Sequence, residues 1–118
     1  MVPLRAPSQR QQERVIRVAR RRHVLRARDY ARDIAVDMDI EVEVDPGRRQ
    51  VAWAVAPSEA ALRSVVLAEA VAFLRTGPSF EALVSEVRVV QVELRGRLDG
   101  RLRTYGWRAT QVNLVVHV

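Results

Sequence analysis

Residues 37–45 read Asp-Met-Asp-Ile-Glu-Val-Glu-Val-Asp, a strict alternation of acidic and apolar side chains. Successive side chains of a β-strand point to opposite faces of the sheet, whereas a helix would spread these acids around its circumference. The stretch therefore predicts a strand with one buried apolar face. The other face presents a row of carboxylates, which we take as candidate interaction residues: Asp37, Asp39, Glu41, Glu43 and Asp45.

This acidic strand belongs to a basic chain of 118 residues with a formal net charge of +6. All 20 basic residues are arginine, a bias typical of GC-rich coding sequence, so where the arginines lie is more informative than their identity. Residues 1–36 contain ten arginines and three acids, and the rest of the chain is nearly neutral. The excess of positive charge is therefore confined to the first third of the chain.

That basic third reads as a helix. Ser8 and Gln11 form a capping box after a flexible N-terminus of residues 1–7, which predicts a basic amphipathic helix over residues 8–36. Such a helix would be roughly 40 Å long, against a radius of gyration of about 13–14 Å for a domain of this size. Either the helix breaks or one end projects. One side of it carries the candidate basic interaction face: Arg10, Arg14, Arg17, Arg21, Arg28 and Arg32.

The acidic strand is followed by a turn signal, Asp45-Pro46-Gly47-Arg48, and by renewed alternation over residues 50–55. These features predict a first antiparallel hairpin. Ser58 is the expected N-cap of a second helix, which Gly77-Pro78 should end. This helix is apolar on almost all sides from Val65 to Leu74, which indicates burial on two sides, either inside the domain or against a neighbouring subunit.

The last third predicts a second hairpin. Asp99-Gly100 is a strong hairpin turn between two runs of apolar alternation, residues 86–98 and 101–118. The alternation slips by one residue near Ala109-Thr110, where we expect a bulge or a bend. We therefore predict a single α+β domain over residues 1–118, with element order α-β-β-α-β-β and helices packed on one face of an antiparallel sheet.

No pattern of catalytic, metal-binding or cofactor-binding residues is evident, so we predict a protein that is not an enzyme and has no cofactor. The alternating acids superficially resemble a calcium loop but lack its glycine and final glutamate, and neighbours on one strand face are almost 7 Å apart. His23 and His117 are the only histidines, and neither has a nucleophile or carboxylate at motif spacing.

Two hypotheses of function remain open. A basic arm and an acidic strand on one chain can pair within the molecule or between copies, and head-to-tail pairing between copies builds rings. We therefore expect a non-enzymatic assembly subunit whose partner is itself or another particle subunit. The alternative is a nucleic-acid-binding protein that contacts phosphates through the arginines of the first helix.

A resemblance favours the first hypothesis. The stretch Gln-Val-Ala-Trp-Ala-Val-Ala-Pro-Ser-Glu-Ala-Ala-Leu at residues 50–62, continuing to Leu74, resembles the strand-to-helix step of small phage tail-terminator and related head-tail completion subunits. The resemblance implies an α+β subunit of a homo-oligomeric ring at the neck or tail of a virion.

No apolar run in the sequence approaches the roughly 20 residues that span a bilayer. Residues 1–7 also lack the apolar core of a signal peptide. We therefore expect a soluble, cytoplasmic or virion-associated protein, neither transmembrane nor secreted through a signal peptide, with no membrane partner.

Overall fold

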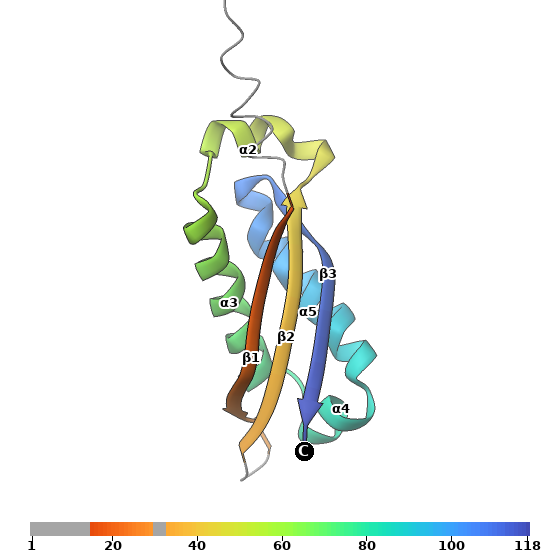
Figure 1. Ribbon diagram of the computed structural model, residues 1–118. Helices are drawn as coiled ribbons and strands as arrows, with labels where there is room; N and C mark the ends of the chain where they lie inside the picture. Colours follow the sequence, from red (N-terminus) through yellow and green to blue (C-terminus); the bar gives the residue numbers. More distant parts are fainter. Residues whose placement is uncertain (1–14, 30–32) are drawn as a thin grey trace, which may run out of the picture.

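The computed structural model describes residues 15–29 and 33–118, which form an antiparallel sheet with helices on one side of it (Figure 1). The elements in chain order are β1 (Ile16–Arg26), β2 (Asp33–Val44), the short 3-10 helix η1 (Pro46–Arg48), α2 (Arg49–Val55), α3 (Glu59–Thr76), α4 (Phe80–Ser85), α5 (Val87–Leu102), the 3-10 helix η2 (Arg103–Tyr105) and β3 (Trp107–His117).

The sheet has three strands in the order β1-β2-β3, and both pairings are antiparallel. The central strand, β2, is the acidic strand, and its apolar residues are buried while its acidic residues are only partly covered. In register, Ile40 of β2 lies between Val18 of β1 and Val112 of β3. One face of the sheet is therefore apolar across all three strands, as the alternation in β2 predicted.

Helices α3 and α5 cover this apolar face, and we call the pair the helix layer (Figure 1). Helix α5 directs a residue at every fourth position into the core, from Val90 to Leu102. The buried residues of α3 are Leu62, Val66, Ala70, Phe73 and Leu74. The other face of the sheet carries the acidic row, and we call it the open face.

Several local predictions are confirmed. Ser58 caps α3, its hydroxyl oxygen accepting from the backbone N–H of Ala61 at 3.0 Å. Helix α3 ends at Gly77 as expected, and Ser79 then caps the short helix α4. The predicted burial of α3 on two sides is not found within the domain, because the side of α3 that faces away from the sheet is exposed.

The predicted N-terminal helix over residues 8–36 is wrong where the structure describes it. Residues 16–26 form β1 and the following strand already begins at Asp33, while the capping box at Ser8 lies outside the described residues. The buried positions explain the error. Before the bulge in β1 the buried residues are the even-numbered Ile16 and Val18. After the bulge the buried residue is the odd-numbered Leu25. An alternation that changes phase in mid-strand imitates the spacing of a helix.

The predicted first hairpin is also wrong, because Asp-Pro-Gly starts a helix here. The side chain of Asp45 accepts from the backbone N–H of Gly47 at 3.0 Å, and Pro46 occupies the first turn of η1. Residues 50–55, predicted as a strand, belong to α2. Six residues with alternate apolar side chains fit a short helix as well as a strand, so the pattern could not decide between them.

The second predicted hairpin is replaced by helix α5 followed by β3. Asp99-Gly100 lies within α5, where the burial of Leu94, Leu98 and Leu102 at intervals of four residues outweighs the turn signal. The predicted slip at Ala109-Thr110 is confirmed in β3, where the pairing shifts between Gln111 and Ala109. Strand β3 pairs with β2, whereas the sequence predicted residues 86–98 as its partner. The α+β character is therefore as predicted, but the arrangement of the elements is not.

Within the described residues, no single helix is long and apolar enough to cross a membrane. The bent pair Pro46–Val55 and Glu59–Thr76 meets the length and composition test only when its two helices are taken together, at 116° to each other.

Gly106 provides a test of the close packing between η2 and α2. Its φ is +78°, and a Cβ there would lie 2.4 Å from the backbone nitrogen of Ala52 and 2.8 Å from the carbonyl oxygen of Arg48. Because both are backbone atoms, Gly106→Ala should lower the free energy of unfolding by about 2–4 kcal/mol in urea titrations.

The matched control is Gly100→Ala in helix α5, where a Cβ would have no atom within 4 Å. Removing a helical glycine should raise the free energy of unfolding by about 0.5–1 kcal/mol. Equal effects of the two substitutions would contradict the close approach at Gly106.

Candidate interaction surfaces

The acidic row on the open face is largely neutralised by cations of the same chain. Asp39 forms a two-pronged ion pair with Arg17 of β1, whose Nε donates to Oδ1 at 2.8 Å and whose Nη2 donates to Oδ2. The hydrogen bond from Arg17 lowers the pKa of Asp39. Glu41 lies directly across the strand pair from Arg17. Asp39, which the sequence presented as part of a free surface, is thus engaged within the molecule.

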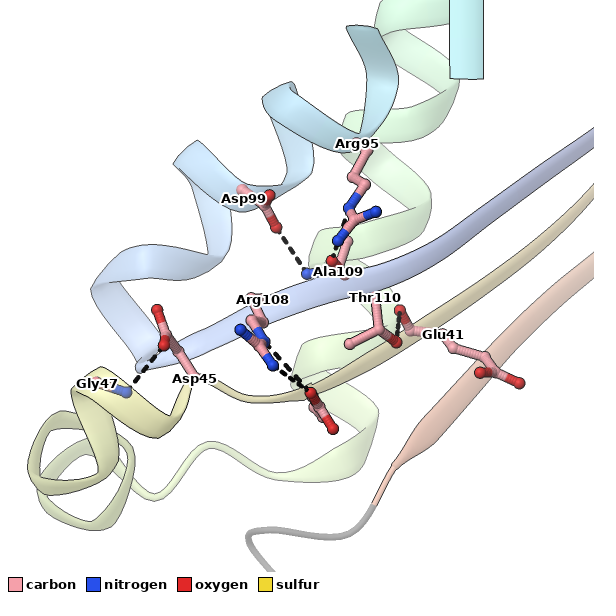
Figure 2. A network of polar contacts seen from close by, with 9 residues as sticks. Glu41, Asp45, Gly47, Arg95, Asp99, Arg108, Ala109 and Thr110 are labelled. Atoms are coloured by element: carbon pink, nitrogen blue, oxygen red, sulfur yellow. Dashed lines mark hydrogen bonds and ion pairs between the residues drawn. The ribbon is translucent and has the colours of Figure 1, made fainter. Parts of the chain in front are cut away.

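The other end of the row is neutralised from β3. Arg108 donates to Oε1 of Glu43 through Nε at 3.2 Å and through Nη2 at 2.8 Å, and this contact is seen with its neighbours in Figure 2. Asp45 caps the start of η1 and lies 3.9 Å from Arg48. Exposed ion pairs contribute little to stability, but a continuous set of them fixes side chains in place.

Asp37 has a different role, because it holds the bulge of β1. Its Oδ1 accepts from the backbone N–H of Arg22, and its Oδ2 lies 3.1 Å from Nε2 of His117 and 3.9 Å from Nη1 of Arg21. The backbone hydrogen bond from Arg22 is the main cause that lowers the pKa of Asp37, followed by the bond from His117. One carboxylate thus joins all three strands.

The bulge changes the direction of the β1 side chains. Arg20 pairs with Met38 and His23 pairs with Val36, so three steps along β1 match two steps along β2. Arg22 has a φ of +48°, a left-handed conformation that is uncommon and costly for a residue with a side chain. In a regular strand Arg20 and His23 would point to opposite faces. Here Arg20 and His23 both lie opposite residues of β2 whose side chains are buried on the face of the sheet that the helix layer covers.

These two side chains reach a groove between β1 and α3, which we call the β1–α3 groove. It has a volume of about 340 Å³ and is lined by Arg20, His23, Leu67, Ala68, Val71, Ala72 and Arg75. The Nε2 atom of His23 is buried and has no hydrogen-bond partner among the described residues. The pKa of His23 is lowered by burial and then by the charges of Arg20 and Arg75. The groove therefore combines an apolar floor with positive charge.

The two edges of the sheet are protected unequally. On β3, three polar side chains of α5 bind the outward backbone. Asp99 accepts from the N–H of Ala109 at 2.7 Å, and Arg95 donates to the carbonyl oxygen of Ala109 at 3.2 Å (Figure 2). Gln91 accepts from the N–H of Leu114 at 2.9 Å. They are spaced four residues apart along one side of the helix. On β1, Arg63 of α3 donates to the carbonyl of Arg17 at 2.7 Å.

The outer surface of the helix layer is built of small side chains over α3 and is mixed over α5, where Arg88, Glu93, Arg97 and Arg101 are exposed together with two valines. Val89 and Val92 of α5 are 52% and 72% exposed, and the outward side of α3 consists mainly of alanine and serine. Two hollows lie in this layer. One of about 340 Å³ is lined by Ser64, Val65, Ala68, Glu69, Ala72 and Arg101, and one of about 470 Å³ by Phe73, Gly77, Glu93, Gly96 and Arg97.

The predicted basic face is not one surface. Arg17 and Arg21 lie on the open face with the acids, and Arg28 is exposed in the turn after β1. The other three predicted members, Arg10, Arg14 and Arg32, lie outside the described residues.

Sequence reasoning missed the groove. In the sequence Arg75 is only a basic residue near the end of a helix. Nothing there connects it to Arg20, because the pattern of residues 16–26 predicts a helix and not an edge strand. Among residues 15–29 and 33–118, no three His, Asp or Glu side chains come together in a way that could hold a metal ion.

No protein-family model and no curated protein sequence matches this chain. Residues 50–55, the strand half of the resemblance to phage subunits, form helix α2. The resemblance is therefore limited to the capped start and apolar body of α3.

The ion pair between Arg17 and Asp39 predicts a specific acid sensitivity. Because the folded state lowers the pKa of Asp39 below its ordinary value of 3.8, the pair contributes stability above about pH 4. That contribution is lost as the pH falls through the lowered pKa. Urea titrations at pH 6 and pH 3 should show a smaller loss of stability for Asp39→Asn than for the unmodified protein.

Glu81→Gln is the control, since Glu81 is exposed on α4 away from the sheet face. It should lose as much stability between the two pH values as the unmodified protein. If Asp39→Asn did the same, the ion pair would have no energetic weight.

Proposed function

We propose that this protein is a non-enzymatic structural subunit that assembles with copies of itself through the outer surface of its helix layer. The observation that carries the proposal is the character of α3, which is apolar on the side that faces the sheet and also on the side that faces away from it. A helix that is apolar all round is normally covered all round. A second copy of the helix layer would supply that cover.

The shape of the surface supports the same proposal. The exposed side chains of Val89 and Val92 are projections on α5, and the hollows beside α3 lie in the same layer. A surface that carries both projections and hollows is able to pair with itself, as a two-fold dimer requires. Successive heterologous contacts of the same surfaces would close a ring, the form implied by the resemblance to head-tail completion subunits.

Charge pairing between copies is not part of this proposal. The sequence left open whether the arginines bind the acidic row within one chain or between copies. Asp39 and Glu43, however, already have arginine partners in their own chain. Breaking those pairs to form equivalent ones between copies would yield little net free energy. An apolar contact centred on the outer side of α3, with Val89 and Val92 of α5, is the more favourable route.

Sedimentation velocity and native mass spectrometry of Ala68→Glu test the proposal. Ala68 is exposed at the centre of the outer side of α3, and a carboxylate there would have to be desolvated in the contact. We expect the unmodified protein to be oligomeric at tens of micromolar, and the variant to associate about tenfold more weakly or worse.

Ala54→Glu is the matched control, an exposed alanine on α2, and it should leave the oligomer intact. Circular dichroism should show that both variants are folded. A strictly monomeric unmodified protein, or equal effects of the two substitutions, would overturn the proposal.

Binding of nucleic acid is the second candidate, favoured by one observation. Arg20, Arg22 and Arg28 are exposed on β1 and in the turn after it, and their guanidinium groups form no ion pair within the described part of the chain. Contacts of these arginines with phosphates would make affinity fall steeply with salt. The arginines would act from an edge strand and its turn, since the helix first expected for them is not formed.

Fluorescence anisotropy with single-stranded and duplex oligonucleotides would test this second candidate. We expect binding at low ionic strength that weakens as salt is raised, with a shallower salt dependence in Arg22→Gly. The absence of salt-sensitive binding would exclude a nucleic-acid partner for this hairpin.

A further inference from the structure

We propose that the β1–α3 groove is a binding site for a small amphiphilic anion, with its oxyanion group between Arg20 and Arg75 and its aliphatic part on Leu67 and Val71. The groove shares Ala68 and Ala72 with the outer surface of α3, whereas Arg20, His23 and Arg75 line the groove alone. The bulge in β1 costs free energy and is held by a specific contact, and such features are typical of functional sites.

The bulge is a maintained feature of the fold. Arg22 adopts a φ of +48°, and Asp37 on the neighbouring strand binds its backbone N–H and lies close to the guanidinium of Arg21. The effect of the extra residue is to place Arg20 and His23 on the same side of the sheet. That side faces α3, where Arg75 stands in the last turn of the helix.

The charges in the groove are uncompensated. No ion pair forms at Arg20 or Arg75 within the described residues, whereas Arg17 on the same strand is fully engaged by Asp39. Two guanidinium groups around one groove repel each other, and both also act on His23. An oxyanion between them would remove the repulsion and gain charge-assisted hydrogen bonds.

The rest of the groove indicates what the anion is attached to. Four of its seven lining residues are apolar, all from α3: Leu67, Ala68, Val71 and Ala72. Binding pockets for small molecules are mostly apolar with a few polar groups that fix orientation, and about 340 Å³ lies at the lower end of their usual volumes. A bare inorganic ion would leave this floor unused, while a carboxylate or phosphate on a short aliphatic chain would cover it.

The unpartnered Nε2 atom of His23 is consistent with the same ligand. A buried polar atom without a partner costs free energy, and in a folded protein it calls for an explanation. His23 lines the groove together with the two arginines, and its Nε2 atom is buried there. A change of its side-chain rotamer would be needed for that nitrogen to reach a ligand oxygen.

Isothermal titration calorimetry with sodium octanoate, inorganic phosphate and octanol tests the proposal on the full chain. Octanoate should bind with one site per chain. Octanol lacks the charge and phosphate lacks the aliphatic part, so each should bind about tenfold more weakly or worse. The NMR signals of His23 and of the methyl groups of Leu67 and Val71 should move as octanoate is added.

Arg20→Gln and Arg75→Gln should each weaken octanoate binding about tenfold, because each removes one charged donor. Arg88→Gln is the control, an exposed arginine at the start of α5 that does not line the groove, and it should leave the affinity unchanged. Equal octanoate affinity in all three variants, or equal affinity for octanol and octanoate, would overturn the proposal.

The bulge itself can be tested through Asp37, as a positioning residue. Asp37→Asn keeps an oxygen that can accept from the N–H of Arg22, so it should retain most of the affinity, whereas Asp37→Ala should lose it although every lining residue is unchanged. Undiminished octanoate binding by a folded Asp37→Ala protein would refute the role of the bulge.

Vesicles identify the source of the anion. If sedimentation with phosphatidylglycerol vesicles depends on Arg20 and Arg75, the site takes a lipid headgroup. Octanoate binding without such sedimentation would assign it to a free carboxylate.

Discussion

The interaction on which the structure depends is the pairing of β2 with a strand on each side. Every second residue of β2, from Ile34 to Val44, is buried, so this one strand contributes the centre of the core. Its register fixes which residues of β1 and β3 face the helices. Because the period of a strand is two, a slip of one residue would exchange the apolar and acidic faces completely, and the register is strongly determined.

The same constraint explains how the charges are arranged. With the acids of β2 fixed on the open face, cations from the flanking strands meet them there, as Arg17 and Arg108 do. The bulge separates Arg17 and Arg21, which lie beside the acidic row, from Arg20, which is turned toward α3. The excess of positive charge in the first third of the chain is therefore not a uniform surface. Part of it balances β2, and part surrounds a groove.

The elements of the fold that could be predicted from the sequence are those whose signals lie in residues close together in the chain. The alternation in β2 and the serine cap of α3 depend on residues close in sequence, and both were predicted correctly. The first strand was not, because its bulge changes the phase of the buried residues between Val18 and Leu25. The bulge is held by Asp37, fifteen residues away in the chain, so no pattern within β1 could reveal it.

Helix α5 shows a second kind of limit. Its valines and its Asp99-Gly100 pair are typical of a hairpin, and local propensity favours strands there. The polar residues of α5 acquire their role only through tertiary contacts, since Gln91, Arg95 and Asp99 bind the outer backbone of β3. Asp99, which the sequence placed in a hairpin turn, therefore protects the edge strand β3 in the structure.

The protection of the edges bears on how copies of the protein can meet. An exposed edge strand invites another strand, and α5 prevents this at β3. At β1 the regular backbone that a further strand would need is interrupted in three ways. These are the bulge, the left-handed conformation of Arg22 and the hydrogen bond that Arg63 donates to the carbonyl oxygen of Arg17. Growth of the sheet from either edge is disfavoured. The outer side of α3, with its small side chains, and the exposed valines of α5 are therefore the surface to which the proposed assembly is assigned.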